Sequence, residues 1–379
     1  MTDFCRLREV AGVFFKLGIM AFGGPAAHIA MMQEEVVQRR QWMTEQQFLD
    51  LVGVTNLIPG PNSTEMAIHC GYIRAGAAGL LLAGICFIIP AVLLTGLIAW
   101  FYAQYGALPD VEPFFFGIKA AVLVIICNAV ITLGRKAVSS RMLAGLGLVA
   151  IILSLLGLPA VAVILGLGVV GMINRSPAKI SVGALMQVAV PILGAGSAVA
   201  LPAVAVTTSH LFLVFLKIGA VLFGSGYVLV AFLNDELVHK LGWLTPQVLM
   251  DSIAIGQFTP GPVLSTATFV GYQIAGIEGA AAATIGIFLP SFFFVLLLNP
   301  VLPYLRRSPA AARFLDAVNV ASVGLMAAVI LDLGYGLAAD WRLLIIAIGA
   351  FAMSYRWKKL NAAWVVIWGS LAGYLLRLI

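Results

Sequence analysis

Charged side chains are scarce in this sequence. Only 10% of its 379 residues are Asp, Glu, Lys or Arg, and 62% are hydrophobic. A soluble domain carries roughly 25% charged residues, so we expect an integral membrane protein with the lipid bilayer as its surroundings. The net charge of +6 calls for no nucleic acid as a partner, because basic residues held on cytoplasmic loops explain it.

Sequence signatures of energy-coupling and cofactor chemistry are also missing. There is no GxxxxGK[ST] phosphate loop, no aspartyl-phosphate motif and no His/Cys cluster at metal-binding spacing. The four cysteines form no CxxC pair, so neither a disulfide nor a metal site is expected. We therefore expect no cofactor and no catalytic residues, and any transport would have to run on an ion or substrate gradient.

The chain contains two copies of one unit. A shift of 201 residues matches Lys16 to Lys217, Glu35 to Glu236 and Pro59-Gly60-Pro61 to Pro260-Gly261-Pro262. After one deletion a shift of 200 matches Pro90 to Pro290. We assign residues 1–175 to an N-terminal repeat, 176–207 to a linker that crosses once more, and 208–379 to a C-terminal repeat.

Hydropathy and loop charges predict an all-α polytopic membrane protein. Each repeat offers about six segments near the ~20 residues that span a bilayer. Arg and Lys fall in alternate loops of the two halves, so the positive-inside rule inverts the second repeat relative to the first. The prediction is two inverted-topology repeats with about 13 spans, a cytoplasmic N-terminus and a periplasmic C-terminus. The segments are 10–30, 47–71, 76–104, 113–134, 142–157 and 158–173, then 209–232, 248–272, 276–300, 313–335, 341–355 and 361–378.

Each Pro-Gly-Pro breaks a helix inside an apolar stretch, because proline removes a backbone donor and clashes with the preceding turn. Duplicated helix breaks are the best pointer from sequence to a transporter's binding site. A helix restarting after the break presents free N–H groups and a positive dipole end, which suit an anion. Whether the broken helices cross or re-enter stays open, and a purely structural kink is the alternative. The predicted substrate contacts are Pro59, Gly60, Pro61, Asn62, Ser63, Thr64, Pro260, Gly261, Pro262, Ser265 and Thr266.

Intramembrane lysines and a second pair of breaks add to this predicted site. Lys16 and Lys217 would supply positive charge, and so would Lys119, although snorkelling to the interface explains a membrane lysine equally well. Glycine at the second breaks would let the backbone approach a ligand, and close helix packing is the alternative. These second breaks are Phe22, Gly23 and Gly24 in the first half, and Gly224 and Ser225 in the second.

Two further features have open interpretations. Glu65 and His69 are four residues apart in the first repeat only, so they could couple transport to protons, or Glu65 could cap its helix. The polar pieces Gln33 to Gln47 and Asn234 to Gln247 could be amphipathic helices on the membrane surface, or gates over a pore.

Several of these motifs resemble one known family. Phe22-Gly23-Gly24-Pro25, the Gln33–Val37 stretch with Trp42, and Asn56 to Ala67 around the first Pro-Gly-Pro are similar to the chromate ion transporter (CHR) superfamily, long-chain bacterial type. The resemblance covers both halves, which correspond to two chromate-transporter domains. It implies antiparallel halves in a bacterial plasma (inner) membrane, exporting chromate and conferring chromate resistance. It also implies sulfate as a competing or related anion.

The residues themselves support a divalent oxyanion and go no further, since chromate and sulfate share charge and shape. A sulfate permease and an anion channel remain alternatives, and an intramembrane reductase would need a redox cofactor that no motif indicates. Whether the protein forms a homodimer is open.

Overall fold

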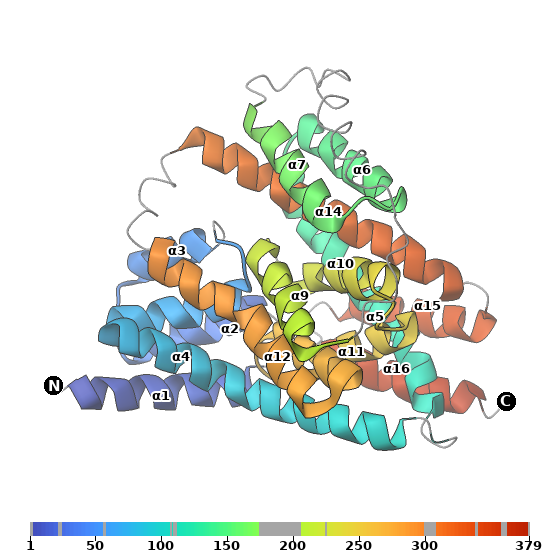
Figure 1. Cartoon of the computed structure of the whole chain (residues 1–379), viewed down its shortest axis with the longest axis horizontal. Coiled ribbons are helices and arrows are strands. Elements are labelled where there is room, and N and C mark those ends of the chain that lie inside the picture. The colour runs from blue at the N-terminus through green and yellow to red at the C-terminus, as the bar shows by residue number, and fades with distance from the viewer. Residues whose placement is uncertain are drawn as a thin grey trace.

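The structure is a computed structural model, and it describes residues 3–21, 25–55, 58–106, 108, 112–173, 206–223, 226–298, 308–337, 340–357 and 362–377. The described part is helical throughout, with no strand (Figure 1). Most of the linker predicted at 176–207 lies outside it, as do the second breaks at Phe22, Gly23, Gly24, Gly224 and Ser225.

The helices of the two halves follow the same order. The predicted segments at 76–104, 113–134, 142–157 and 158–173 and their second-half counterparts each correspond to one helix or helical arm, whereas those at 10–30, 47–71, 209–232 and 248–272 are each divided among two or more helices. The first half comprises α1 (Asp3–Met20), α2 (Pro25–Gln33), the π-helix η1 (Glu34–Arg39), α3 (Glu45–Thr55), α4 (Asn62–Tyr105), α5 (Glu112–Ala137), α6 (Arg141–Leu155) and α7 (Ala160–Ile173). The second comprises α9 (Thr208–Val221), η2 (Gly226–Val228), α10 (Leu229–Leu233), the π-helix η3 (Asn234–Lys240), α11 (Pro246–Phe258), η4 (Val263–Ser265), α12 (Thr266–Leu298), α14 (Pro309–Leu337), α15 (Trp341–Arg356) and α16 (Ala362–Arg377).

α4 and α12 are each two helical arms joined by a tight reversal. Ala75 and Gly76 leave helical geometry (φ −145° and +62°), and Ala275 and Gly276 do the same (φ −145° and +60°). The arms touch where a Cβ on Gly71 would overlap the Gly79 carbonyl. The segment after each Pro-Gly-Pro is therefore a short helix folded back against a long one, a hairpin that small residues permit.

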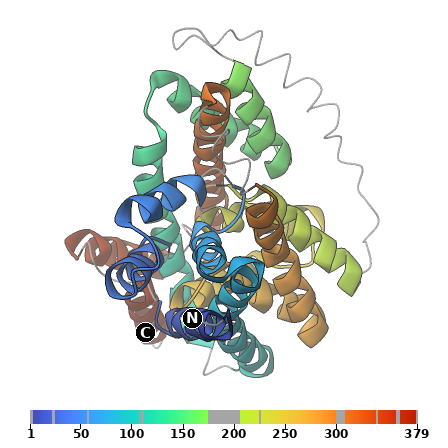
Figure 2. The same ribbon diagram turned by 90° about the vertical axis from the view of Figure 1, so that its left-hand side faces the viewer.

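The two halves interleave rather than packing as separate bodies. α1 packs along α4 and α9 along α12, and the two hairpins contact each other. Beyond them, α6 and α7 of the first half pack on α14 of the second (Figures 1 and 2). α15 and α16 of the second half likewise pack on α5 of the first. Equivalent helices thus exchange partners, and one hydrophobic core includes residues of both halves.

Glycine at the interleaved contacts brings backbones together. A Cβ on Gly117 of α5 would overlap the Gly369 carbonyl of α16 and lie 2.7 Å from the Gly373 Cα. The equivalent contact of α7 with α14 places Gly171 against Ala317.

We expect Gly117→Ala to lower the unfolding free energy by about 1–3 kcal/mol, because the added methyl must push two helix backbones apart. Gly12→Ala in α1 is the matched control, since its added Cβ meets nothing within 4 Å. Alanine's higher helix propensity should leave that control unchanged or slightly more stable. Thermal unfolding in detergent compares them, and equal melting temperatures would contradict the close contact.

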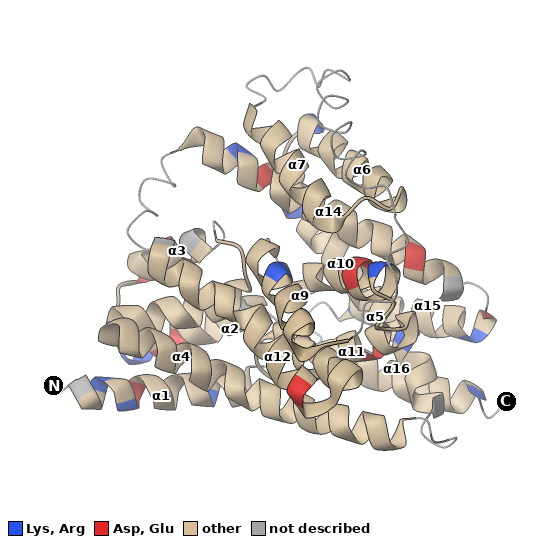
Figure 3. Cartoon of the chain, viewed as in Figure 1, with Lys and Arg blue, Asp and Glu red and all other residues tan. Residues whose placement is uncertain are grey.

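Four helices of the described residues are long and apolar enough to cross a membrane: Asn62–Tyr105, Pro113–Ala137, Val263–Leu297 and Pro309–Tyr335. Charged side chains are sparse along them (Figure 3). Exposed apolar side chains such as Leu93 (67%) and Ile277 (77%) cover these helices, as expected for surfaces that face lipid.

Candidate functional site

Each Pro-Gly-Pro break is hydrogen-bonded to the end of the first helix of the other repeat, and the two bonds are reciprocal. The Gly60 N–H donates to the Leu222 carbonyl at 2.6 Å, and the Gly261 N–H donates to the Ala21 carbonyl at 2.8 Å. Leu222 and Ala21 are equivalent residues that follow α9 and α1. Each broken helix is thus held by the end of the first helix of the other repeat, so the contact has two-fold character.

The glycines at the breaks take positions that other residues resist. Gly60 has φ +142° and Gly261 φ +87°, in the range that L side chains rarely adopt. A Cβ on Gly261 would lie 2.8 Å from the Ala91 Cβ, and one on Gly60 would lie 2.6 Å from the Ser291 Oγ. Ala91 and Ser291 are equivalent residues on the long arms of α4 and α12. Each Pro-Gly-Pro therefore seats against the hairpin of the other half.

The predicted hydroxyl contacts are buried in this arrangement. Ser63, Thr64, Ser265 and Thr266 are each at most 2% exposed, and Asn62 is half-buried. Thr95 Oγ1 donates to Ser265 Oγ at 3.3 Å across the halves, and Thr266 Oγ1 donates to the Val263 carbonyl at 2.8 Å. A cavity of about 10 Å³ beside Tyr227, Gln257 and Thr266 is the size of one water molecule. These hydroxyl groups are therefore shielded from solvent by the described part of the chain.

The two predicted site lysines are partners of buried glutamates. Lys16 Nζ lies 2.6 Å from Glu35 Oε1, and Lys217 Nζ lies 2.6 Å from Glu236 Oε1. Each glutamate also binds a cation four residues on in its π-helix, Arg39 at 3.2 Å and Lys240 at 3.0 Å. The lysine side chains are about half exposed, while the glutamates are nearly buried. Each repeat thus has its own charge cluster of a lysine, a glutamate and a second cation, and this cluster connects the π-helix of the repeat to its first helix.

Residues 8–172 and 209–374 both match the family model described as chromate transporter. The chain belongs to the chromate transporter family. It is 30% identical over 370 residues to the chromate transport protein of Cupriavidus metallidurans, covering 97% of this chain and 92% of that protein. It is 31% identical to the probable chromate transport protein of Synechococcus elongatus (97% and 95% covered) and 32% identical to the chromate transport protein of Pseudomonas aeruginosa (96% and 90% covered). No solved structure matches this chain.

The predicted polar pieces are not continuous amphipathic helices in this family member. After α2, the chain forms six π-helical residues, turns at Gln41 with φ +53°, and starts α3 at Glu45. The second repeat makes the same π-helix and turn, with Gly242 at φ +62°. Short π-helices are rare and frequently mark functional sites.

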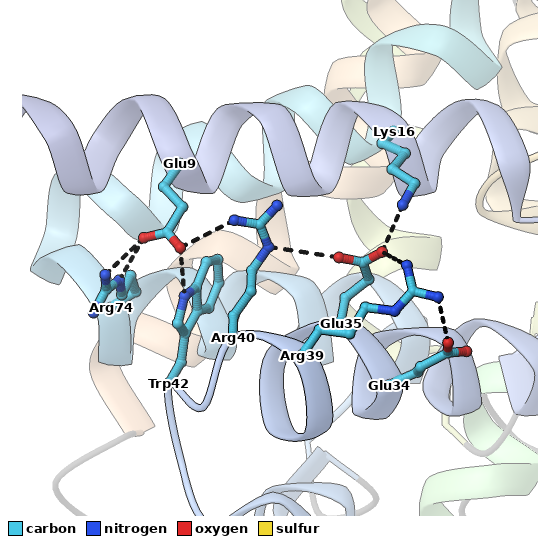
Figure 4. A network of polar contacts seen from close by, with 8 residues as sticks. All are labelled: Glu9, Lys16, Glu34, Glu35, Arg39, Arg40, Trp42 and Arg74. Carbon is cyan, nitrogen blue, oxygen red and sulfur yellow. Dashed lines mark hydrogen bonds and ion pairs between the residues drawn. The ribbon is translucent and has the colours of Figure 1, made fainter.

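In the first repeat the charge cluster extends along one side of α1 (Figure 4). Glu9 accepts hydrogen bonds from Arg74 at 2.6 Å, Arg40 at 3.1 Å and the Trp42 indole at 3.1 Å. Arg40 also reaches Glu35 at 3.5 Å, which links the Glu9 contacts to those of Lys16. In the second repeat His210 takes the place of Glu9, and its ring packs edge-on against Trp243 at 4.9 Å.

The predicted Glu65–His69 pair is not formed. Glu65 is completely buried and His69 is 1% exposed, but within the described chain neither Glu65 oxygen nor His69 Nε2 has a hydrogen-bond partner. Glu65 does not cap its helix either, since the N-cap residue is Pro61 and no side chain caps that end. Lys119 of α5 lies close enough to act electrostatically on Asp251 of α11, which accepts a hydrogen bond from Tyr102 at 2.7 Å.

We expect low pH to weaken the ion pairs of both charge clusters. The hydrogen bond from Lys16 holds the pKa of Glu35 below 4.5. Burial would raise the pKa of Glu236, but hydrogen bonds and charge from Lys217 and Lys240 outweigh it and leave this pKa below 4.5 too. A lowered folded-state pKa contributes stability that is complete above the unfolded value and is lost as pH falls through the folded value. The melting-temperature difference between wild type and Glu236→Gln should therefore narrow below about pH 4.5, and a constant difference would contradict the ion pair.

Several residues that form contacts at the site were not among those predicted from the sequence. The Ala21 and Leu222 carbonyls, Ser291 and Thr95 carry no motif of their own, because a backbone acceptor or a lone hydroxyl has no sequence signature. Glu35 and Glu236 did have a signal. The same alignment that matched the lysines matched these glutamates, at an identical spacing of 19 residues.

Proposed function

We propose that this protein transports chromate outward across a bacterial plasma membrane by alternating access of two inverted halves, and so confers chromate resistance. Family membership and relatives whose names specify chromate transport support the substrate. The observation that carries the mechanism is the reciprocal pair of hydrogen bonds that joins each Pro-Gly-Pro break to the first helix of the other repeat. A two-fold axis in the membrane plane would make such halves inverted, in agreement with the distribution of loop charges.

The oxyanion cradle is the pair of restarting helices. Asn62, Ser63 and Thr64 open one helix, and Ser265 and Thr266 lie at the start of the other. Backbone N–H groups and the positive dipole end of a helix favour a divalent tetrahedral anion. Because these groups are buried here, the anion reaches them when the halves separate on one side of the membrane.

In this proposal Lys16 and Lys217 lie beside the anion site rather than within it. Lys16 precedes Ala21 by five residues, about 7.5 Å along a helix, and Lys217 precedes Leu222 by the same interval. Their glutamate partners offset their charge in the closed state. The lysines therefore hold the π-helical segments over the breaks, and they attract the anion when those segments move.

Radiolabelled chromate flux in proteoliposomes tests the proposal, with pH, sulfate and voltage gradients imposed one at a time. We expect accumulation against the chromate gradient, driven by one of them, with sulfate as competitor or counter-substrate in an antiport. Currents that never run uphill would indicate an anion channel instead. Sulfate uptake that chromate barely inhibits would indicate a sulfate permease.

A further inference from the structure

The first Pro-Gly-Pro break contains an acid without a counter-charge. Glu65 follows the break by four residues, is 0% exposed, and has no hydrogen-bond partner for either carboxyl oxygen within the described chain. A buried polar group without a partner destabilises the folded state, and a charged one does so more strongly. An ionisable residue inside a membrane-spanning helix is therefore a candidate functional residue.

A hydroxyl of the other repeat faces the same glycine as this acid. A Cβ on Gly60 would overlap Glu65 Oε1 and lie 2.6 Å from Ser291 Oγ, so both oxygens border one side of Gly60. Ser291 comes from α12, is fully buried, and its Oγ also lacks a partner among the residues described. The backbone between them is fixed by the bond from Gly60 to Leu222. The two groups therefore lie beside the same glycine at the interface between the halves, with no hydrogen bond between them in the described chain.

The second break has no such arrangement, although its backbone is equivalent. Thr266 stands in the place of Glu65 and donates to the Val263 carbonyl at 2.8 Å. Ala91 stands in the place of Ser291 and presents a methyl group to Gly261. The backbone of the break therefore does not need the polar groups of Glu65 and Ser291 in order to form.

Charged and titratable groups on the neighbouring elements have contacts elsewhere. No hydrogen bond from a described residue reaches either oxygen of the Glu65 carboxyl. His69, one turn along the same helix, has an Nε2 that lacks a partner, as His28 Nδ1 does on α2. The groups with partners are Lys16 with Glu35, Glu9 with Arg74, His28 Nε2 with the Ala21 carbonyl, Glu45 with Gln33, Asp50 with Gln46, Asp251 with Tyr102, and Glu278 with Thr208.

We propose that Glu65 binds the proton that drives transport, and that Ser291 of the other half is the polar group that lies beside it. This inference rests on the proposed transport and names its coupling ion. In the closed state the carboxyl keeps a proton, because no cation among the described residues pairs with a negative charge there. Separation of the halves removes Ser291 from Glu65 and admits water, so the proton leaves on one side and is replaced from the other.

The transport test uses Glu65→Gln, which keeps the shape of the protonated acid but cannot release a proton. In proteoliposomes we expect its pH-gradient-driven chromate flux to fall to the level of protein-free liposomes. We expect the remaining chromate–chromate exchange to lose its dependence on pH. Ser291→Ala, which copies Ala91 of the other break, should shift the pH of half-maximal flux. Glu45→Gln on α3 is the surface-acid control and should retain the wild-type pH profile.

A second readout does not involve chromate. Purified wild-type protein should show the infrared carbonyl stretch of a protonated carboxylic acid, and Glu65→Gln should lack it. Wild-type pH dependence of exchange in Glu65→Gln, an unchanged infrared band, or flux driven by sodium and not by protons would each overturn the proton site. A Glu65-dependent band in a protein that moves no chromate would instead overturn the proposed function.

Discussion

We expect alanine at Gly60 or at Gly261 to abolish chromate flux. At Gly60 the new methyl would overlap the Glu65 carboxyl and press on Ser291, and at Gly261 it would meet the Ala91 Cβ at 2.8 Å. Both glycines also have a positive φ, which alanine rarely adopts. Relief requires the Pro-Gly-Pro backbone to shift, and that shift breaks the hydrogen bond to Leu222 or Ala21.

Two glycines elsewhere allow the effect of backbone strain to be measured without steric overlap. Gly157 and Gly242 have φ +81° and +62°, and a Cβ on either meets nothing within 4 Å. Gly157→Ala and Gly242→Ala therefore carry the strain of a positive φ and no steric conflict. Flux in proteoliposomes and thermal unfolding in detergent compare all four variants. If Gly60→Ala and Gly261→Ala behaved like the two controls, the close packing of each break against the other half would not be needed for transport.

The second large effect is expected at Lys217. Lys217→Met removes one of the two cations that bind Glu236 and leaves that buried carboxylate with Lys240 alone. We expect flux to fall, and we expect Glu236→Gln to restore part of it in the double variant. A coupling energy of about 1 kcal/mol is expected, because the lysine is half exposed and solvent screens the pair. If the double variant were as impaired as Lys217→Met, the lysine would act on the substrate directly.

The first repeat supplies the matched comparison. Glu35 keeps Arg39 and Arg40 after Lys16→Met, whereas the second repeat has Leu241 where the first has Arg40. The same double-mutant cycle, applied to Lys16 and Glu35, should therefore give a smaller coupling energy. An equal or larger value at Lys16 would contradict the role assigned to the extra arginine.

Local chemistry made much of the fold predictable from the sequence. The helices stop at Thr55 and Phe258 and resume after each Pro-Gly-Pro, because proline and glycine interrupt a helix wherever they occur. The long apolar segment predicted at 113–134 became α5, Glu112–Ala137. Such features depend on a few neighbouring residues, and the duplication doubled the signal for each.

Contacts between segments far apart in the sequence could not be predicted by the same reasoning. A membrane lysine satisfies its charge equally well by snorkelling or by pairing, so Lys16 alone did not reveal Glu35. The exchange of partners among α5, α7, α14 and α16 depends on how whole helices pack, and equivalent apolar faces allow either partner. The Glu65–His69 spacing suggested a pair, but the fold directs Glu65 toward Gly60 and Ser291 instead.

The interleaving of the halves bears on how such a protein arises from a smaller one. A chain with a single repeat would leave the partner surfaces of its α5, α6 and α7 uncovered, and the Gly60 N–H without its acceptor. Its fold is completed only when a second copy supplies those groups, so the ancestral half-length form would be an obligate pair of chains. Fusion of two genes would then join an assembly that already existed, and would free each copy to lose or gain a charged residue independently. The presence of Glu65 in one repeat and Thr266 in the other is the kind of divergence that fusion permits.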